Sequence, residues 1–199
     1  MIIFHSVHVS AGTPTEAFYY VVTTIDASVR FDGLCCRHGQ QLIVQSMLVL
    51  GVNVGFGAGA RGPGVAFVEL DGERANPVLV ESGELRTGDL SIIDQIGDLA
   101  RKFSSLLSGM KPDVVVIRVA DVPPRPSRKA SPRHRLMIEG ALAYVCAEED
   151  VRDVFLRNGK EVGEALNLTK DEAMNKGKAL DARRAEAAAA ALSGLPEQS

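Results

Sequence analysis

A basic segment without any acidic residue lies between Asp121 and Glu139. Its cationic side chains belong to Arg125, Arg128, Lys129, Arg133 and Arg135, with His134 among them. Such a patch can neutralise phosphate groups and give salt-dependent, sequence-independent affinity for nucleic acid. Four prolines extend the segment and no aromatic residue is interleaved, so phosphate contact is indicated rather than stacking on bases. An exposed loop without a ligand explains the same residues equally well.

Three acidic residues stand at the ends of apolar segments. Asp121 follows one such segment, and Glu69 and Asp71 end another. A loop-entry role for Asp121 and a turn role for Asp71 are the preferred interpretations. The acidic run at 148–150 is interpreted as the solvated end of a helix.

The segment Gly57–Gly62 matches the pattern G-x-G-x-x-G of dinucleotide-binding loops. That motif requires a helix directly after the glycines, because the helix N-terminus receives the pyrophosphate. Here Pro63-Gly64 and a strand-like apolar run follow instead. We therefore interpret the glycines as a flexible connection between two strands.

The composition limits the class of protein. The chain has 199 residues, 46% of them hydrophobic, so it can bury one core. A formal net charge of −3 argues against a globally basic coat protein for nucleic acid, although not against a local basic groove. Three cysteines give neither a disulfide framework nor a zinc-ligand spacing, and a reducing, cytoplasmic setting is expected. The longest apolar stretch, 42–54, contains polar residues, and no membrane span or signal peptide is expected.

Three short apolar runs follow one another after residue 46 and predict three antiparallel strands. They are residues 47–54, 65–70 and 77–81. The pair Asp71-Gly72 is a tight-turn signal between the second and the third. Residues 92–107 then have apolar side chains at a 3.6-residue period, which predicts a helix that Ser91 or Asp89 caps and Gly109 ends.

The remaining elements alternate between strands and helices. A run at 114–120, apolar on both faces except for Arg118, predicts a central parallel strand. The predicted elements after it are a helix at 133–147, a strand at 153–156, and helical segments at 160–167 and 170–192. Antiparallel strands followed by βα units indicate an α/β fold, a mixed five-stranded sheet with helices on its faces. This is the ribonuclease H order of elements.

Residues 1–46 show neither helical nor strand periodicity over most of their length. Two interpretations are open: a small N-terminal addition that packs on the domain, or a start codon assigned too far upstream. The second is preferred, and poor order is expected under both. The domain proper is expected at 47–199.

Six segments follow one another between Met47 and Leu168: MLVLGVNVG, GVAFVEL, LVESGELRTGD, KPDVVVIRV, IEGALAYVCAEEDV and RNGKEVGEAL. In order and spacing they resemble motifs of the RuvC family of Holliday-junction resolvases. The first two are similar to that family's opening strand and its hairpin partner. The next two resemble its Ser-Gly…Arg-Thr segment and its Pro-Asp-x-x-x-Ile-Glu strand, and the last two its Arg-Gly helix and Pro-x-x-Val-Lys segment.

The resemblance implies two-metal hydrolysis of phosphodiesters, in which carboxylates at the ends of the central strands hold two Mg²⁺ ions. The family's first-strand aspartate falls on Asn53, whose neutral oxygen is a poorer ligand. The glutamate that ends the fourth strand falls on Arg118, a cation that opposes metal binding and can pair with a phosphate or a carboxylate.

The C-terminal acids of the family can be placed in two registers. If LDARRAEA corresponds to the family's Asp-Ala-Ala-Asp segment, Asp181 is kept and Arg184 replaces its partner. If ALSGLPE corresponds to its Leu-Gly-Leu-Pro linker, neither acid is retained. Both registers leave at most one of the four expected carboxylates, which does not hold two Mg²⁺ ions.

Three hypotheses follow. The first is a RuvC-like protein of impaired catalysis that binds branched or duplex DNA through Arg118 and the basic segment at 125–135. The second is an active Mg²⁺-dependent structure-specific endonuclease with a rearranged acid set such as Asp71, Asp121 and Asp181. The third is a non-catalytic scaffold or interaction subunit with its Ala-rich C-terminal helix as the interface.

The hypotheses assign residues as follows. Under the second, Asn53, Asp121 and Asp181 are the candidate catalytic residues, and Asp121 and Asp181 are the candidate metal ligands. The candidate DNA-binding residues of the first are Arg118, Arg125, Arg128, Lys129, Arg133 and Arg135. Mg²⁺ is expected only with activity, and a homodimer is left open as the assembly.

Overall fold

The computed structural model describes residues 47–56, 62–88, 90–121 and 130–197. The expectations for residues 1–46 and for the glycine-rich segment lie outside these ranges. So do Arg125, Arg128 and Lys129 of the basic segment. No helix of the described part is long and apolar enough to cross a membrane.

Five strands form one mixed sheet in the order β3-β2-β1-β4-β5. The strands are β1 (Val49–Phe56), β2 (Pro63–Glu73), β3 (Asn76–Arg86), β4 (Val114–Arg118) and β5 (Asp153–Arg157). The first three pair antiparallel, whereas β4 and β5 add to β1 in parallel. The predicted fold class, with antiparallel strands first and βα units afterwards, is confirmed.

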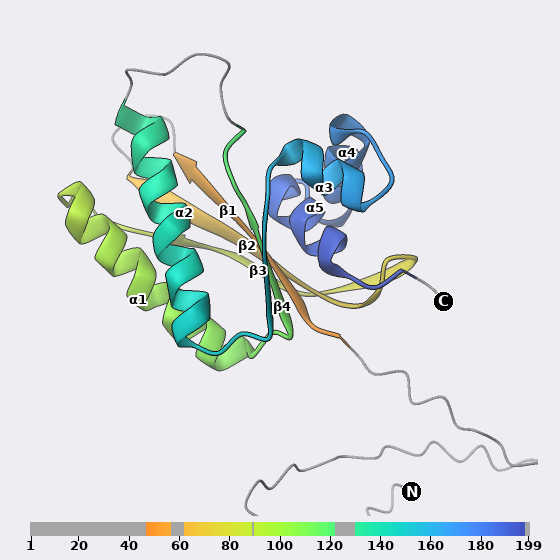
Figure 1. Ribbon diagram of the computed structural model, residues 1–199, viewed down its shortest axis with the longest axis horizontal. Coiled ribbons are helices and arrows are strands. Elements are labelled where there is room, and N and C mark those ends of the chain that lie inside the picture. Colours follow the sequence, from red (N-terminus) through yellow and green to blue (C-terminus); the bar gives the residue numbers. More distant parts are fainter. Residues whose placement is uncertain (1–46, 57–61, 89, 122–129, 198–199) are drawn as a thin grey trace, which may run out of the picture. The chain divides into compact units, whose positions relative to one another are not determined.

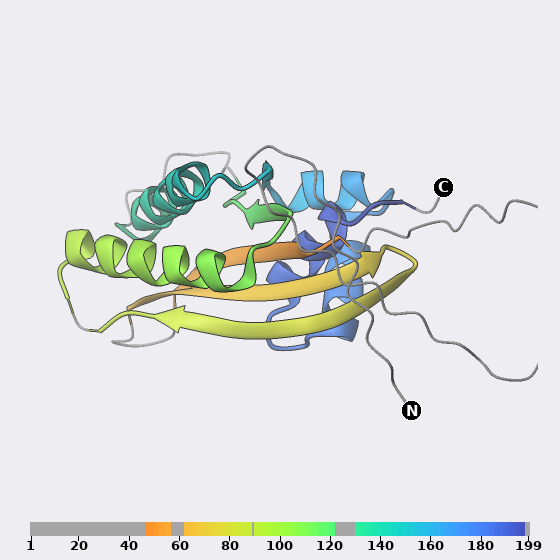
Figure 2. The same cartoon turned by 90° about the horizontal axis from the view of Figure 1, so that it is seen from below.

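Helices cover both faces of the sheet (Figure 1). They are α1 (Ile92–Met110), α2 (Ala130–Glu148), α3 (Gly159–Ala165), α4 (Lys170–Leu180) and α5 (Ala185–Gly194). Because side chains alternate along a strand, Leu50, Val52 and Val54 join one core with α1 and α2, while Val49 joins a second core with α5. Figure 2 shows the long β2–β3 hairpin running alongside α1.

α5 packs on the second face of the sheet by close approach of small residues. Ala187, Ala188, Ala190 and Ala191 are buried there. A Cβ atom on Gly51 of β1 would lie 2.1 Å from the carbonyl oxygen of Ala187 and 2.3 Å from the amide nitrogen of Ala191. Glycine is therefore required at this position, since any side chain would push the helix off the sheet.

Several boundaries differ from the sequence prediction. The β2–β3 turn lies at residues 74–75, so Asp71 belongs to β2 rather than to the turn, and Gly72 takes its positive φ of 96° inside the strand. β3 also continues to Arg86, beyond the predicted end at 81. Its added residues include a glycine, Gly83, that leaves room for the ring of Phe67.

The helix boundaries also need two corrections. Ser91 caps α1 as predicted, but the left-handed residue at its C-terminus is Lys111 (φ 51°) and not Gly109. The predicted single helical segment at 170–192 is two helices, because Asp181 has an extended conformation and ends α4. The break turns α5 back across the sheet.

Substitution of Gly51 tests the close approach of α5. Gly51→Ala should lower the free energy of unfolding by about 3 kcal/mol, because overpacking forces backbone shifts in a filled core. Gly55→Ala is the matched control, since a Cβ on Gly55 of the same strand meets no atom within 4 Å. Equal stability of the two variants in urea unfolding would contradict this packing.

Glu69 is a buried carboxylate of β2. Only 4% of the residue is exposed, and its Oε1 atom has no hydrogen-bond partner among the described residues. Burial raises the pKa of this carboxyl, and the negative charges of Glu81 and Asp71 raise it further. The folded state consequently binds a proton at Glu69 more tightly than the unfolded chain does.

The sign of this pKa shift predicts a pH-dependent effect of Glu69→Gln. Ionised Glu69 destabilises the fold above its raised pKa, and the cost vanishes as the pH falls below the unfolded value of about 4.3. The variant should therefore gain on the order of 1 kcal/mol in unfolding free energy at neutral pH and nothing near pH 4. Denaturant unfolding at both pH values measures the gain, and a gain independent of pH would refute the assignment.

Candidate functional site at the carboxyl ends of β1 and β4

Asn53 and Arg118 are direct neighbours on the two central parallel strands. Arg118 is the last residue of β4, and Asn53 stands where the pairing of β1 with β4 ends. Open α/β sheets bind ligands at this carboxyl edge of their parallel strands. By the alternation along each strand, they share the face on which Val116 and α5 pack. The two positions that the resemblance singled out therefore form one site.

The Arg118 side chain is buried in this site and bonded within it. Only 4% of the residue is exposed. Its Nη2 atom lies 3.1 Å from Oδ2 of Asp121, and its Nη1 atom donates to the carbonyl oxygen of Val119. A guanidinium remains charged when buried, so a permanent positive charge stands at the end of β4.

Asp121 gathers donors from three parts of the chain. Its Oδ2 atom accepts from Lys170 Nζ at 2.8 Å as well as from Arg118, and its Oδ1 atom accepts from the backbone N–H of Gly159 at 3.0 Å. The bond from Lys170, with those from Gly159 and Arg118, holds the pKa of this carboxyl well below its usual range despite some burial. Asp121 is therefore ionised at neutral pH and fully engaged.

Arg135 of α2 connects Asn53 to a buried acid. Its Nη2 atom donates to Oδ1 of Asn53 at 3.1 Å, and its Nε atom donates to Oε1 of Glu139 at 2.6 Å. The same Oε1 accepts from the backbone N–H of Ala120 at 2.9 Å. Glu139 is 4% exposed, and its Oε2 atom has no partner among the described residues. Arg135 thus braces the site from the α2 side.

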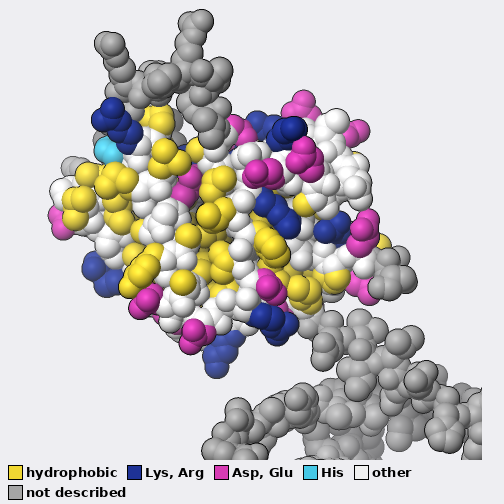
Figure 3. Space-filling model, in the orientation of Figure 1, with side chains coloured by type: hydrophobic (Ala, Val, Ile, Leu, Met, Phe, Trp, Pro, Cys, Tyr) yellow, Lys and Arg dark blue, Asp and Glu magenta, His cyan; other side chains and the backbone are white. Residues whose placement is uncertain are grey.

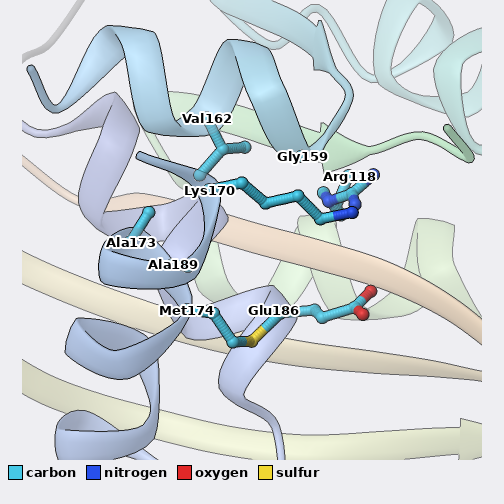
Figure 4. A pocket seen from close by; sticks show the side chains of 8 residues that line it. All are labelled: Arg118, Gly159, Val162, Lys170, Ala173, Met174, Glu186 and Ala189. Carbon is cyan, nitrogen blue, oxygen red and sulfur yellow. The ribbon is translucent and has the colours of Figure 1, made fainter. Parts of the chain in front are cut away.

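A small pocket opens beside Arg118 (Figure 4). It is lined by Arg118, Gly159, Val162, Lys170, Ala173, Met174, Glu186 and Ala189. Its volume is about 10 Å³, the room of about one water molecule. The Lys170 side chain runs toward the guanidinium, and the carboxylate of Glu186 lies across the opening from it.

Glu186, Lys170 and Gly159 belong to the site but were not predicted from the sequence. Glu186 lies in the first turn of α5, three residues after Arg183. The sequence predicted one helical segment over 170–192, which places Glu186 in the middle of a helix. Had the start of a separate helix at Ala185 been predicted, Glu186 would have been a first-turn acid and a candidate for the site. Lys170 and Gly159 begin α4 and α3, so their positions depend on how the two helices fold back.

Asp181 has a structural position away from Arg118. Its Oδ1 atom accepts from the backbone N–H groups of Arg183 and Arg184, and its Oδ2 atom accepts from Arg184 Nη1 at 3.0 Å. Arg184 also bonds Ser82 and Gly83 on β3, the strand at the opposite edge from β5. Burial alone would raise the pKa of Asp181, but these hydrogen bonds lower it overall. The carboxylate closes a turn between two helices.

Asp71 also lies far from Asn53 and Arg118. Asn53 pairs with Ala66 of β2, and Asp71 stands five residues farther along that strand. At about 3.3 Å per residue the separation is roughly 17 Å. The rearranged acid set of Asp71, Asp121 and Asp181 is therefore not brought together by this arrangement.

The residues at the strand ends do not fit two Mg²⁺ ions. In the described ranges, no group of three or more His, Cys, Asp and Glu side chains is placed to hold a metal. Asn53 supplies a neutral oxygen that already accepts from Arg135. Oδ2 of Asp121 already accepts from two cations, and its Oδ1 accepts from the backbone N–H of Gly159. A hard divalent cation would have to displace these donors and approach the charge of Arg118.

The three predicted basic residues that the structure describes divide into two groups. Arg118 and Arg135 point inward and bond other residues of the site, whereas Arg133 is exposed at the start of α2. Across α3 and α4 the acidic and basic side chains are mixed rather than separated by sign (Figure 3). This side of the domain therefore has local groups of cations rather than a uniformly basic face.

Comparison with solved structures identifies the fold. The Thermus thermophilus RuvC structure has a TM-score of 0.57 at 19% sequence identity, covering 74% of this chain and 92% of that chain. T. thermophilus RuvC in complex with a Holliday junction substrate has a TM-score of 0.54 at 16% identity, covering 74% and 91%. No family model matches the chain, and no curated protein sequence gives a significant match. The predicted resemblance to RuvC is confirmed for the ribonuclease H-like fold.

Removal of Arg135 tests whether this side chain braces the site. Arg135→Met leaves Glu139 buried without its cation, which should cost about 3 kcal/mol of unfolding free energy at neutral pH. The double variant Arg135→Met with Glu139→Met should recover most of the stability. Additive losses in this double-mutant cycle would show that the pair does not act as one unit.

Proposed function

We propose that this domain binds branched or duplex DNA as a RuvC-like protein of impaired catalysis. The observation that carries the proposal is the charge at the strand ends. Arg118 places a buried guanidinium beside Asn53, where a metal-dependent nuclease of this fold needs carboxylates. A fixed cation attracts phosphate but repels the metal ions that would cleave it.

The comparison supports the choice of ligand. T. thermophilus RuvC, which shares the fold, has been solved with a Holliday junction substrate. We infer that the same end of the sheet faces nucleic acid in this chain. Phosphate contacts by cations at this end would give affinity without base recognition, because phosphates carry no sequence information.

The cations have different roles in the proposal. Arg133, together with Arg125, Arg128 and Lys129 of the basic segment, would contact phosphates. Arg135 is a positioning residue, since its donors hold Asn53 and Glu139. Arg118 is buried and contributes its positive charge from inside the domain. It would contact a ligand only where the Asp121 carboxylate gives up its hydrogen bond.

Cleavage assays separate this proposal from an active nuclease. The full chain should bind a labelled four-way junction yet leave it intact with Mg²⁺ or Mn²⁺, because its acids are bonded to cations. Asp181→Ala and Asp121→Ala are the matched variants for any cleavage that is seen. Metal-dependent cleavage that either variant abolishes would establish the endonuclease and reject impaired catalysis.

The salt dependence of binding tests the basic segment. Changing Arg125, Arg128 and Lys129 together to Ala should reduce the slope of log affinity against log salt by up to about three, roughly one for each lost phosphate contact. The control changes Arg101, Lys111 and Arg152, three exposed cations elsewhere on the domain, to Ala. Equal slopes for the two triple variants would remove the segment from the interface, and no DNA binding at low salt would favour a scaffold.

A further inference from the structure

The carboxylate of Asp121 is bound as a free anion would be. It accepts from a guanidinium at 3.1 Å, an ammonium at 2.8 Å and a backbone N–H at 3.0 Å. Guanidinium, ammonium and backbone N–H groups are also the donors that proteins use to bind phosphate oxygens. These three donors come from three elements of the fold, β4, α4 and α3.

A glycine allows the donors to converge. A Cβ on Gly159 would lie 2.5 Å from Nη2 of Arg118 and 2.7 Å from Cε of Lys170. The backbone φ of Gly159 is not in the left-handed region, so conformational freedom does not explain the residue. The glycine instead leaves the space in which the two cations approach one oxygen atom.

The Asp121 carboxylate lies where an anion from solvent can replace it. Arg118 is buried, but the side chains of Asp121 and Lys170 are 48% and 49% exposed. A competing anion can therefore reach Lys170 from solvent and replace the carboxylate without unfolding the site. Glu186 is the acid that lines the same pocket, and it disfavours any second anion deeper inside.

We propose that Arg118, Lys170 and the Gly159 N–H form a phosphate-binding subsite, of which Asp121 is the tethered occupant. A backbone phosphate of nucleic acid displaces the carboxylate and takes its donors. The subsite rests on the proposed DNA binding for its biological ligand, but its chemistry is that of a single phosphate group. The Asp121 carboxylate thereby competes with phosphate for these donors and lowers the affinity of the subsite for free phosphate.

Asp121→Asn is the decisive variant. Its neutral side chain cannot compete with a phosphate, so inorganic phosphate should bind at least fivefold more tightly than to the unchanged chain. Titration of the full chain, followed by the amide resonances of Gly159 and Lys170, measures the dissociation constant at the site itself. Duplex DNA should bind Asp121→Asn with a salt slope steeper by about one, the value for one added phosphate contact.

Asp113→Asn is the control for the change in net charge. Asp113 also bonds an arginine and a backbone N–H, but it precedes β4 at the opposite end of that strand. Adding Lys170→Met to Asp121→Asn should abolish the gain in phosphate affinity. Equal gains for Asp113→Asn and Asp121→Asn, or a gain that survives Lys170→Met, would overturn the subsite.

Two further outcomes keep the subsite distinct from the proposed function. Phosphate binding by Asp121→Asn without DNA binding by any variant would support the subsite and reject the DNA-binding function. If the chain binds DNA and Asp121→Asn leaves the affinity and the salt slope unchanged, the DNA-binding function is supported and the subsite is rejected. If Asp121→Asn fails to fold, Lys170→Met in the otherwise natural chain should lower the phosphate-induced shift at Gly159 at least twofold, and an unchanged shift would overturn the subsite.

Discussion

A buried guanidinium needs an anion close by, and this requirement organises the end of the sheet. Arg118 lies on a central strand and is almost wholly removed from solvent. Leaving its charge unpaired there would cost several kcal/mol. Asp121 provides the anion three residues later, and the same carboxylate then ties down the first residues of α3 and α4. The neutralisation of one side chain therefore helps to place two helices.

The other half of the site is built around a second arginine and a second acid. Arg135 pairs with Glu139 within α2 and reaches the neutral amide of Asn53 on β1. Arginine serves this role because its planar group donates in several fixed directions at once. Two arginine–carboxylate pairs thus stand at the carboxyl ends of neighbouring strands, where the two-metal chemistry of the resembled family would need carboxylates free to bind cations. The carboxylates at these strand ends are therefore paired with arginines rather than free.

Local patterns predicted much of this structure. The apolar runs of β1 and β4, the period of α1 and the order of elements were sufficient for the sheet and its two layers of helices. Asn53 and Arg118 were found because each stands at a fixed place in a strand motif. Lys170 and Gly159 bond Asp121 although they are 49 and 38 residues away in the sequence. A periodic pattern of residues does not predict contacts at such separations. The register of α5 was missed for a related reason: Asp181 ends α4 through contacts that involve β3, which a helical pattern over 170–192 does not reveal.

The alanine surface of α5 has a consequence for the order in which the chain folds. All five strands precede α5 in the sequence, yet Val49, Val114 and Val116 on one face of the sheet are covered by its alanines and by Leu192 and Leu195. During synthesis this face stays exposed to water and to other chains until the last helix has left the ribosome. The close fit at Gly51 leaves little tolerance in this docking, because a gap of about 0.5–1 Å already forfeits a quarter to a half of the dispersion energy of a contact. Until α5 docks, the uncovered second face of the sheet is an aggregation hazard for the nascent chain.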